Sequence, residues 1–358
     1  MDLETRIGLI SSVGEEVLTL EELKQLLETN DHPSAYDGFE PSGILHIAQG
    51  IVRATNVNKM IKAGCKFKFY VADWHAWANN KYGGDLEKIN TAGEYFIEVW
   101  KACGMQLDKV EFIKANEVVD DKEYWNKVMR VATNTTVNRI LRCGQIMGRS
   151  EGEIQNASQI LYPCMQAADI FQFDVDICQL GMDQRKVNIL ARELAPKLGY
   201  KKPVAVHHHM VMGLGEPPKS DLTGVEKKIE MKMSKSKPDT AIFMDDSPEE
   251  VARKIKKAYC PEAQVENNPI MEYAKYIIFE KYKTMSIERP EKFGGNLEIE
   301  GYDELVSIYS SSKLHPMDLK NATIKYVNEI LEPVREHFEK NKKAKELYET
   351  VKQYAITR

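Results

Sequence analysis

Strand-like and helix-like segments alternate along the first third of this chain, and this alternation restricts its fold more than any other feature. Apolar runs typical of strands lie at 34–39, 66–72 and 110–114, with helix-like stretches between them at about 46–62 and 85–103. Parallel strands need a crossover connection of this kind, usually a helix, and such crossovers are right-handed. The pattern therefore predicts an α/β fold built on a parallel sheet.

The alternation stops and then resumes. Residues 121–172 read as helices, and we expect a helical insertion packed against the sheet edge. Strand signals return at 174–181 and 203–207, with a helix expected over 184–198. Together with the earlier strands, they predict a Rossmann-like, doubly wound parallel sheet. Residues 1–30 should be helical, because their leucines recur at helical spacing.

The last third of the chain differs from the rest in composition and in predicted secondary structure. Residues 213–240 are rich in Gly, Pro, Lys, Asp and Glu, which predicts a long exposed loop. A helix start follows at 247–250, and the remaining chain reads as almost entirely helical. We therefore expect two domains, a Rossmann-type domain over 1–245 and an all-α domain over 246–358.

Charge and cysteine usage exclude some classes of protein. The formal net charge of −5 over 358 residues argues against a generally basic nucleic-acid-binding chain, although a local basic surface is compatible with it. The six cysteines are scattered and include no C-x-x-C pair, which indicates reduced thiols. We see no signal peptide and no apolar stretch of about 18 residues. We expect a cytoplasmic protein with no membrane attachment.

A first candidate binding element joins the strand at 34–39 to the next helix. Glycines in Tyr-Asp-Gly-Phe-Glu-Pro-Ser-Gly (36–43) allow close backbone approach, and a helix N-terminus favours anions. His46 and Gln49 are three positions apart, so they share one face of the first helical turn. The element suits a phosphate group; a turn with a capping histidine is the alternative.

A second candidate element is Lys232-Met233-Ser234-Lys235-Ser236, within the expected loop. Two lysines on a polar loop can fold over a triphosphate, while a solvated charged loop is the alternative. With His46 and Gln49 opposite, the lysines would stabilise charge that develops on the phosphates of ATP. The two elements together indicate chemistry at the α-phosphate of ATP.

A third element lies in the apolar helix that includes residues 160–169. Tyr162, Gln166 and Asp169 stand at positions i, i+4 and i+7, so they line one helix face. The stripe is either solvent-facing or the wall of a pocket in which Asp169 accepts a hydrogen bond from a substrate hydroxyl. Tyr36, at the end of the first strand, could reach the same hydroxyl.

Three successive histidines, His207 to His209, raise the question of a metal site. Neighbouring side chains on a strand point to opposite faces, so these three cannot all bind one ion. We expect no dedicated metal site, and Mg²⁺ would arrive with ATP.

The first two elements together resemble the HIGH and KMSKS motifs of class I aminoacyl-tRNA synthetases. Further motifs are Ala-Asp-Trp-His-Ala (72–76), Leu-Tyr-Pro-Cys-Met-Gln (161–166), Gly-Met-Asp-Gln-Arg-Lys (181–186) and Leu-His-Pro-Met-Asp-Leu-Lys-Asn (314–321). With these, nearly the whole chain from Ser34 to Phe338 resembles the archaeal and eukaryotic tyrosyl-tRNA synthetases.

The resemblance implies roles for individual residues. The hydroxyl of bound tyrosine would contact Tyr36 and Asp169, and its α-amino group would contact Tyr162, Gln166 and Gln184. The ATP site would comprise Gly38, Glu40, His46, Gln49, Asp183 and Lys235, with Asp183 facing the ribose. Catalysis would rest on His46, Gln49, Lys232 and Lys235.

The resemblance also implies that the C-terminal domain binds the anticodon of tRNA(Tyr). Phe293 would stack on the first anticodon base, with His315 and Asp318 near it; aromatic stacking and a carboxylate acceptor suit single-stranded RNA. A buried phenylalanine and a helix-capping aspartate are the alternative reading.

These features predict an ATP-dependent ligase that attaches L-tyrosine to tRNA(Tyr) through a tyrosyl-adenylate. A tryptophanyl-tRNA synthetase, which shares the fold, is one alternative, and a non-catalytic RNA-binding paralogue is another. By analogy we also expect a homodimer, with its interface in the helical insertion at 121–160.

Overall fold

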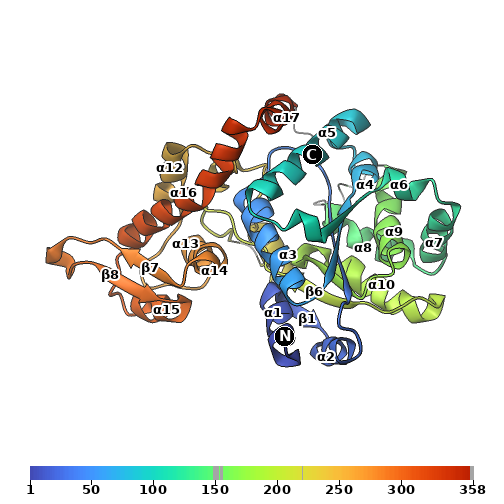
Figure 1. The fold of residues 1–358 in the computed structure, drawn as a ribbon, viewed down its shortest axis with the longest axis horizontal. Coiled ribbons are helices and arrows are strands. Elements are labelled where there is room, and N and C mark those ends of the chain that lie inside the picture. The colour runs from blue at the N-terminus through green and yellow to red at the C-terminus, as the bar shows by residue number, and fades with distance from the viewer. Residues whose placement is uncertain (148–152, 154–155, 220, 355–358) are drawn as a thin grey trace.

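The computed structural model describes residues 1–147, 153, 156–219 and 221–354. A six-stranded sheet forms its centre, with the strand order β1-β6-β5-β2-β3-β4 (Figure 1). The strands are β1 (Gly14–Leu18), β2 (Ser34–Phe39), β3 (Lys66–Val71), β4 (Val110–Lys114), β5 (Ile177–Gly181) and β6 (Val204–His208). All neighbours are parallel except β1, which runs antiparallel to β6. The predicted α/β, Rossmann-like sheet is confirmed.

Helices cover both faces of this sheet, as a doubly wound fold requires. Alternate strand residues enter two different cores. Phe67 and Phe69 belong to the core with α3 (Arg53–Lys62) and α5 (Leu86–Ala102), whereas Tyr70 belongs to the core with the insertion helices. Burial on both faces explains why these strands read as nearly continuous apolar runs.

The expectation that residues 1–30 are wholly helical is wrong for their middle part. Two helices, α1 (Leu3–Val13) and α2 (Leu20–Thr29), flank the edge strand β1. The sequence Gly-Glu-Glu-Val-Leu has no clear strand alternation, so its conformation depends on pairing with β6. Glu16 of this strand binds Arg185 at 2.7 Å, which ties β1 to the start of α10 (Arg185–Leu198).

The predicted helical insertion is present, but it begins slightly earlier than residue 121 and packs on a face of the sheet, not against its edge. It contains α6 (Asn116–Val119), α7 (Lys122–Thr133), α8 (Val137–Cys143) and α9 (Ala157–Gln172). A short helix, α4 (Asp73–Ala78), precedes α5 and contacts α9. The insertion therefore covers the face of the sheet from which Tyr36 and Tyr70 project.

The segment 213–240 is not the continuous exposed loop that its composition predicted. It contains helix α11 (Gly224–Met231), and the lysine-rich part after it docks on the sheet domain. Met212 and Lys232 form an isolated β-bridge, and Met233 is buried. The apolar methionines anchor a segment whose charged residues suggested only solvent exposure.

The C-terminal part is largely helical, as expected, but it is not all-α. Its helices are α12 (Pro248–Lys257), α13 (Pro269–Tyr273), α14 (Phe279–Lys281), α15 (Tyr302–Ser310), α16 (Pro316–Lys340) and α17 (Lys342–Lys352). Between them β7 (Thr284–Ile287) and β8 (Leu297–Glu300) pair as an antiparallel ladder. These strands are four residues each and were too short to stand out in the sequence.

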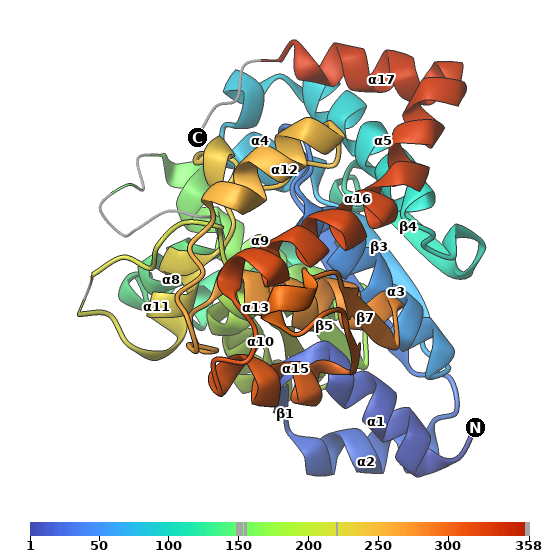
Figure 2. The ribbon, with the colours of Figure 1, turned by 90° about the vertical axis from the view of Figure 1, so that its left-hand side faces the viewer.

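The C-terminal helices pack directly on the sheet domain. Helix α17 lies beside α5 in both views (Figures 1 and 2). Nε2 of His337 lies 2.8 Å from Oε2 of Glu98, and the ring of Tyr348 packs against Tyr95. Within the described ranges, no helix has both the length and the apolar character needed to cross a membrane.

Candidate active site

A cavity of about 1120 Å³ opens at the carboxyl ends of β2, β5 and β6. Carboxyl ends of parallel strands are the usual place for ligands in open α/β sheets. The cavity brings together every site residue predicted for the first 245 positions. They are Tyr36, Gly38, Glu40, His46, Gln49, Tyr162, Gln166, Asp169, Asp183, Gln184, Lys232 and Lys235. Their roles toward a ligand stay predictions at this point.

Asp169 of α9 places a buried carboxylate in this cavity. Its side chain is 1% exposed, and Oδ1 accepts a hydrogen bond of 3.0 Å from the Tyr124 hydroxyl. Nε2 of His75 lies 3.1 Å from Oδ2, but no hydrogen bond from the described residues reaches this oxygen. Oδ2 therefore has hydrogen-bonding capacity left for a donor on a ligand, with the His75 ring beside it.

Tyr36 supplies a second hydroxyl to the same cavity. It is fully buried on β2, and burial, followed by the negative charge of Asp169, raises the pKa of its hydroxyl well above the usual value. The phenol therefore stays protonated and can donate a hydrogen bond. Gly38 lies close by, and a Cβ there would sit 3.2 Å from the Tyr36 hydroxyl.

The polar stripe of α9 faces the cavity and not the solvent. Tyr162 and Gln166 are both buried. The Tyr162 hydroxyl donates to Oε2 of Glu40 at 3.0 Å, and Nε2 of Gln166 donates to Oε1 of Gln184 at 3.0 Å. These bonds hold polar atoms from α9, β2 and the turn after β5 on one wall.

The first turn after β2 is a π-helical turn, Ala48–Val52, which continues directly into α3. Such turns recur at functional sites. Nε1 of Trp100 donates to the backbone carbonyl of Gln49 at 2.8 Å and holds the turn against α5. Nδ1 of His46 accepts from the Gln49 amide at 3.4 Å, which leaves Nε2 to carry the ring proton.

His46 is a neutral hydrogen-bond donor in this environment. It is buried, and burial, followed by the charges of Lys235, Lys232 and Arg53, lowers its pKa well below the usual value. It can therefore donate a hydrogen bond to a phosphate oxygen without contributing charge. The positive charge at this site comes from other residues.

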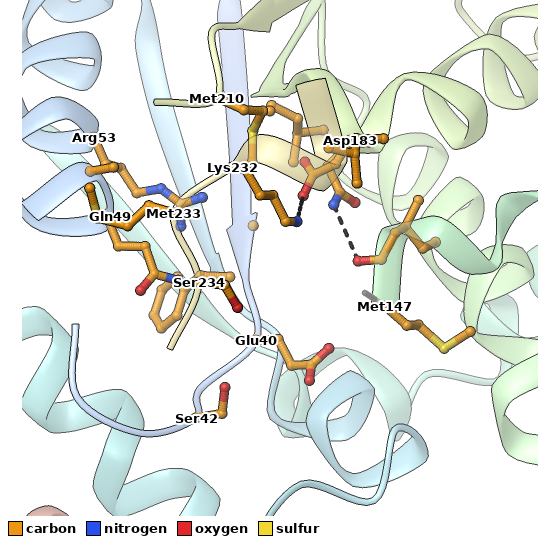
Figure 3. A pocket seen from close by; sticks show the side chains of 18 of the residues that line it. Glu40, Ser42, Gln49, Arg53, Met147, Asp183, Met210, Lys232, Met233 and Ser234 are labelled. Carbon is orange, nitrogen blue, oxygen red and sulfur yellow. Dashed lines mark hydrogen bonds and ion pairs between the residues drawn. The ribbon is translucent and has the colours of Figure 1, made fainter. Parts of the chain in front are cut away.

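Lys232 reaches across the cavity to Asp183. Their Nζ and Oδ2 atoms are 2.7 Å apart (Figure 3). Burial alone would raise the pKa of Asp183, but the charge of Lys232 and its hydrogen bond lower the pKa below the usual value. Gly181 makes room for this pair, because a Cβ there would meet Oδ1 of Asp183 at 2.6 Å.

Lys235 has a different electrostatic state from Lys232. Its ammonium group donates to the backbone carbonyl of Ser42 and lies 5.0 Å from the centre of the Phe96 ring. Burial, followed by the charge of Lys81, lowers its pKa to about 7, with a smaller contribution from Arg53 and an opposing one from Glu40. Lys235 is thus poised to take up a proton when an anion binds beside it.

The three histidines of β6 and the segment after it have separate partners. Nδ1 of His207 lies 2.8 Å from Glu16, and His208 faces the cavity and bonds Gln179. His209 lies between Glu15 and Glu272, within 3.0 Å of each. Within the part of the chain that is described, no group of three acidic, histidine or cysteine side chains is arranged to hold a metal ion.

The three residues predicted to contact tRNA lie outside the cavity, in the C-terminal part. Phe293 is 60% exposed, so it is not a core residue. His315 is the N-cap of α16, and its Nδ1 accepts from the Met317 amide at 3.1 Å. Arg289 bonds the carbonyls of Gly295 and Lys313, which brings the Phe293 loop beside the start of α16.

Two features of the cavity were missed from the sequence. Tyr124 lies on α7, 45 positions from its partner Asp169, and no local pattern connects them. Arg53 lines the cavity beside Gln49, and its spacing of four residues from Gln49 on one helix face could have indicated it. Its partner Asp37 is buried on β2.

The fold and the cavity define a class of protein. A mostly parallel sheet carries one cavity at its carboxyl edge, with lysines and hydrogen-bonding groups on one part of its wall and a buried carboxylate on another. This is the arrangement of an α/β protein that binds a nucleotide beside a second small ligand.

Comparison with known proteins identifies the family within this class. A family model described as "tRNA synthetases class I (W and Y)" matches residues 28–332. The chain therefore belongs to this family of class I aminoacyl-tRNA synthetases.

Individual relatives show which members of this family the chain resembles. Tyrosine–tRNA ligase 1, cytoplasmic, of Arabidopsis thaliana is 50% identical over all of this chain and 90% of its own length. Tyrosine–tRNA ligase 2, cytoplasmic, of the same plant is also 50% identical, and the chain spans 46% of it. The crystal structure of tyrosyl-tRNA synthetase from Pyrococcus horikoshii with L-tyrosine has a TM-score of 0.90 and 41% identity, covering 98% of this chain and 100% of that one. The resemblance to the archaeal and eukaryotic enzymes is confirmed.

Proposed function

We propose that this chain is a tyrosine–tRNA ligase. In the first step an oxygen of the tyrosine carboxylate attacks the α-phosphorus of ATP, and pyrophosphate leaves. In the second step a ribose hydroxyl of the terminal adenosine of tRNA(Tyr) attacks the tyrosyl carbonyl, and AMP leaves. The relatives named as tyrosine–tRNA ligases support this substrate assignment.

The single observation that carries the tyrosine assignment is the hydrogen-bonding capacity left on the buried carboxylate of Asp169, beside His75. Oδ2 is buried in the cavity without a hydrogen bond from the described residues. A phenol hydroxyl would donate to it, whereas phenylalanine would leave it unpaired. The indole of tryptophan would place its N–H differently, so the family's other amino acid fits this acceptor less well. A site of this kind rejects the analogue without the hydroxyl by a factor of about 10⁴–10⁵.

The other end of the cavity would bind the phosphates of ATP and stabilise their charge. The tyrosine carboxylate is already ionised, so its attack needs no general base, and catalysis consists of positioning and charge stabilisation. His46 would donate as a neutral imidazole, Gln49 as an amide, and Lys232 and Lys235 as cations. Mg²⁺ bound to the phosphates of ATP would supply the remaining neutralisation. The intact set argues against a non-catalytic paralogue.

We assign residues 1–245 to a catalytic domain, with the insertion at about 121–172 and the lysine segment at 213–240. Residues 246–358 would form an anticodon-binding domain that uses Phe293, His315 and Asp318. The exposure of the Phe293 ring and its position beside the start of α16 support this assignment. A cytoplasmic location agrees with the names of the plant relatives and with six unpaired cysteines.

We also propose that the protein is a homodimer. The interface was predicted in the insertion at 121–160. Large apolar side chains are exposed there, Met129 on α7 at 57% and Val137 on α8 at 63%, and Leu161 on α9, just beyond this segment, is 40% exposed. Apolar surface of this kind marks interaction sites on soluble proteins.

The tyrosine assignment is tested by ATP–pyrophosphate exchange with tyrosine, phenylalanine and tryptophan. We expect exchange with tyrosine alone. Asp169→Asn should lower kcat/KM for tyrosine by about 10- to 100-fold, because a charged acceptor is lost. Asp174→Asn, an exposed carboxylate beyond the end of α9, is the control and should exchange normally. Exchange with tryptophan and not with tyrosine would refute the assignment.

The state of Lys235 predicts how ATP binding depends on pH. Its pKa of about 7 means that the free protein loses this positive charge as the pH rises through 7. ATP should therefore bind with uptake of a proton and several-fold more weakly at pH 8.5 than at pH 6.5. Calorimetry in two buffers with different ionisation enthalpies measures both effects.

Lys235→Arg should remove the proton uptake near neutral pH, because a guanidinium stays charged. Lys197→Arg, on the far end of α10, is the matched control and should titrate like the unchanged protein. Equal proton uptake in Lys235→Arg and the unchanged protein would assign the titration to another group.

If the C-terminal domain binds the anticodon, a change there should affect the transfer of tyrosine to tRNA(Tyr) but not the formation of tyrosyl-adenylate. Phe293→Ala should raise KM for tRNA(Tyr) by about 10-fold, since stacking on a base is lost. Tyrosine-dependent pyrophosphate exchange should not change, because Phe293 lies outside the cavity. Phe293→Trp retains a stacking ring and should restore the KM. An unchanged KM for tRNA(Tyr) in Phe293→Ala would contradict the role of this residue.

The dimer proposal predicts the mass in solution. Light scattering should give twice the chain mass of 40.9 kDa at micromolar concentration. Val137→Glu should shift the protein toward the single-chain mass, because a charge would be buried in the interface. Leu20→Glu, an equally drastic change at an exposed site on α2, is the control. A single-chain mass for the unchanged protein would exclude the dimer.

A further inference from the structure

Asp37 is a buried carboxylate that the proposed mechanism does not use. It lies on β2, between Tyr36 and Gly38 of the cavity wall, and its side chain is completely buried. Burial raises its pKa to about 6, and the charge of Arg53 opposes this shift. Among the described residues, the charge of Arg53 is the largest influence that favours its ionised form, followed by the backbone amide of Gly38.

Arg53 extends from the first position of α3 into the cavity. Its Nε lies 3.2 Å from Oδ2 of Asp37, and its side chain is 17% exposed. Figure 3 shows its guanidinium beside Gln49, directed toward the side of the cavity that holds Lys232 and Asp183. The contact with Asp37 occupies one edge of the guanidinium. The other N–H groups form no hydrogen bond with any residue that the structure describes.

Other inward-facing arginines of this chain differ from Arg53 in this respect. Arg6 donates to the carbonyls of Ala63, Leu27, Asn30 and Asp31. Arg185 forms three hydrogen bonds with Glu16, and Arg192 bonds both Pro203 and Glu22. Those arginines form between two and four hydrogen bonds each and so connect elements of the fold. Arg53 contacts only Asp37 in this way among the described residues, and it lines the cavity.

The surroundings of Arg53 indicate which part of a nucleotide it faces. Its charge contributes to lowering the pKa values of His46, His208 and Lys235, so all three lie near it. Asp183, the proposed ribose contact, also interacts with Asp37. The cavity wall that holds Arg53 also holds Gln49 of the proposed phosphate end and Asp183 of the proposed ribose end (Figure 3). In a nucleotide bound across this wall, the phosphate next to the ribose, which is the α-phosphate, would face Arg53.

We propose that Arg53, oriented by Asp37, binds the phosphate adjacent to the ribose in ATP and in the adenylate. This inference rests on the proposed function, because it assumes a nucleotide in the cavity. A guanidinium presents paired N–H groups that match two phosphate oxygens, and its position on a helix needs no loop movement. Lys232 and Lys235, on their separate segment, then serve the outer phosphates that leave.

The test compares nucleotide ligands with and without that phosphate. Binding of ATP, AMP and adenosine is measured by calorimetry on the full chain and on Arg53→Met. AMP and ATP should bind at least about 10-fold more weakly to the variant, and adenosine should bind within about twofold of the unchanged protein. Arg53→Lys keeps a point charge beside Asp37 and should lose less AMP affinity than Arg53→Met. Asp37→Asn, which leaves the guanidinium unoriented, should also weaken AMP and spare adenosine.

Arg130→Met is the matched control, because it removes one positive charge on α7, outside the cavity. It should bind all three ligands normally. If Arg53→Met does not fold, the double variant Asp37→Asn/Arg53→Met, which leaves no unpaired buried charge, replaces it in the same comparison. Equal loss of AMP and adenosine affinity, or no loss at all, would overturn the role of Arg53.

The test of Arg53 can fail without refuting the proposed function. Tyrosine-dependent pyrophosphate exchange by the unchanged protein tests the reaction itself, and its absence would overturn the proposed function together with this inference. Normal exchange combined with equal AMP binding by Arg53→Met and the unchanged protein would overturn the inference alone.

Discussion

Parallel pairing of β2 with both β3 and β5 is the constraint on which the rest of this structure depends. It directs the carboxyl ends of the central strands to one edge, where the chain leaves the sheet through polar turns. Tyr36 and Asp183 are 147 positions apart in sequence, yet they line one cavity because β2 and β5 are neighbours. The insertion helices then close one side of that cavity, and the lysine segment closes another.

Burial of charge gives the cavity its chemical character. The two lysines of one short segment differ in their electrostatic environment. Lys232 forms an ion pair with Asp183, whereas burial and the charge of Lys81 lower the pKa of Lys235 to about 7. One lysine thus anchors the segment and the other responds to an incoming anion. His46, which is neutral, contributes geometry and not charge. Binding of a phosphate group would relieve the repulsion among these groups, which is how such a site favours its ligand.

The C-terminal helices are connected to this edge of the sheet by specific contacts. His209, directly after β6, lies between Glu15 of β1 and Glu272 of α13 and stacks on Tyr276 with ring centres 4.2 Å apart. Helix α17 packs on α5, whose Trp100 holds the π-helical turn at Gln49. The part of the chain that carries Phe293 is therefore attached to the cavity through packed side chains on two sides.

The sequence by itself determined the parallel sheet, the helical insertion and the face of α9 that lines the cavity, because each follows from local periodicity. It also located the cavity residues of the two elements around His46 and Lys232, because each element is contiguous in the chain. It did not reveal β1, α11, β7 and β8, since short polar segments adopt these conformations only when a distant partner offers hydrogen bonds or a buried surface. Tertiary structure alone decided the pairs Tyr124–Asp169 and Asp37–Arg53 and the state of Lys235. Burial and proximity between distant segments create these properties, and no local pattern records them.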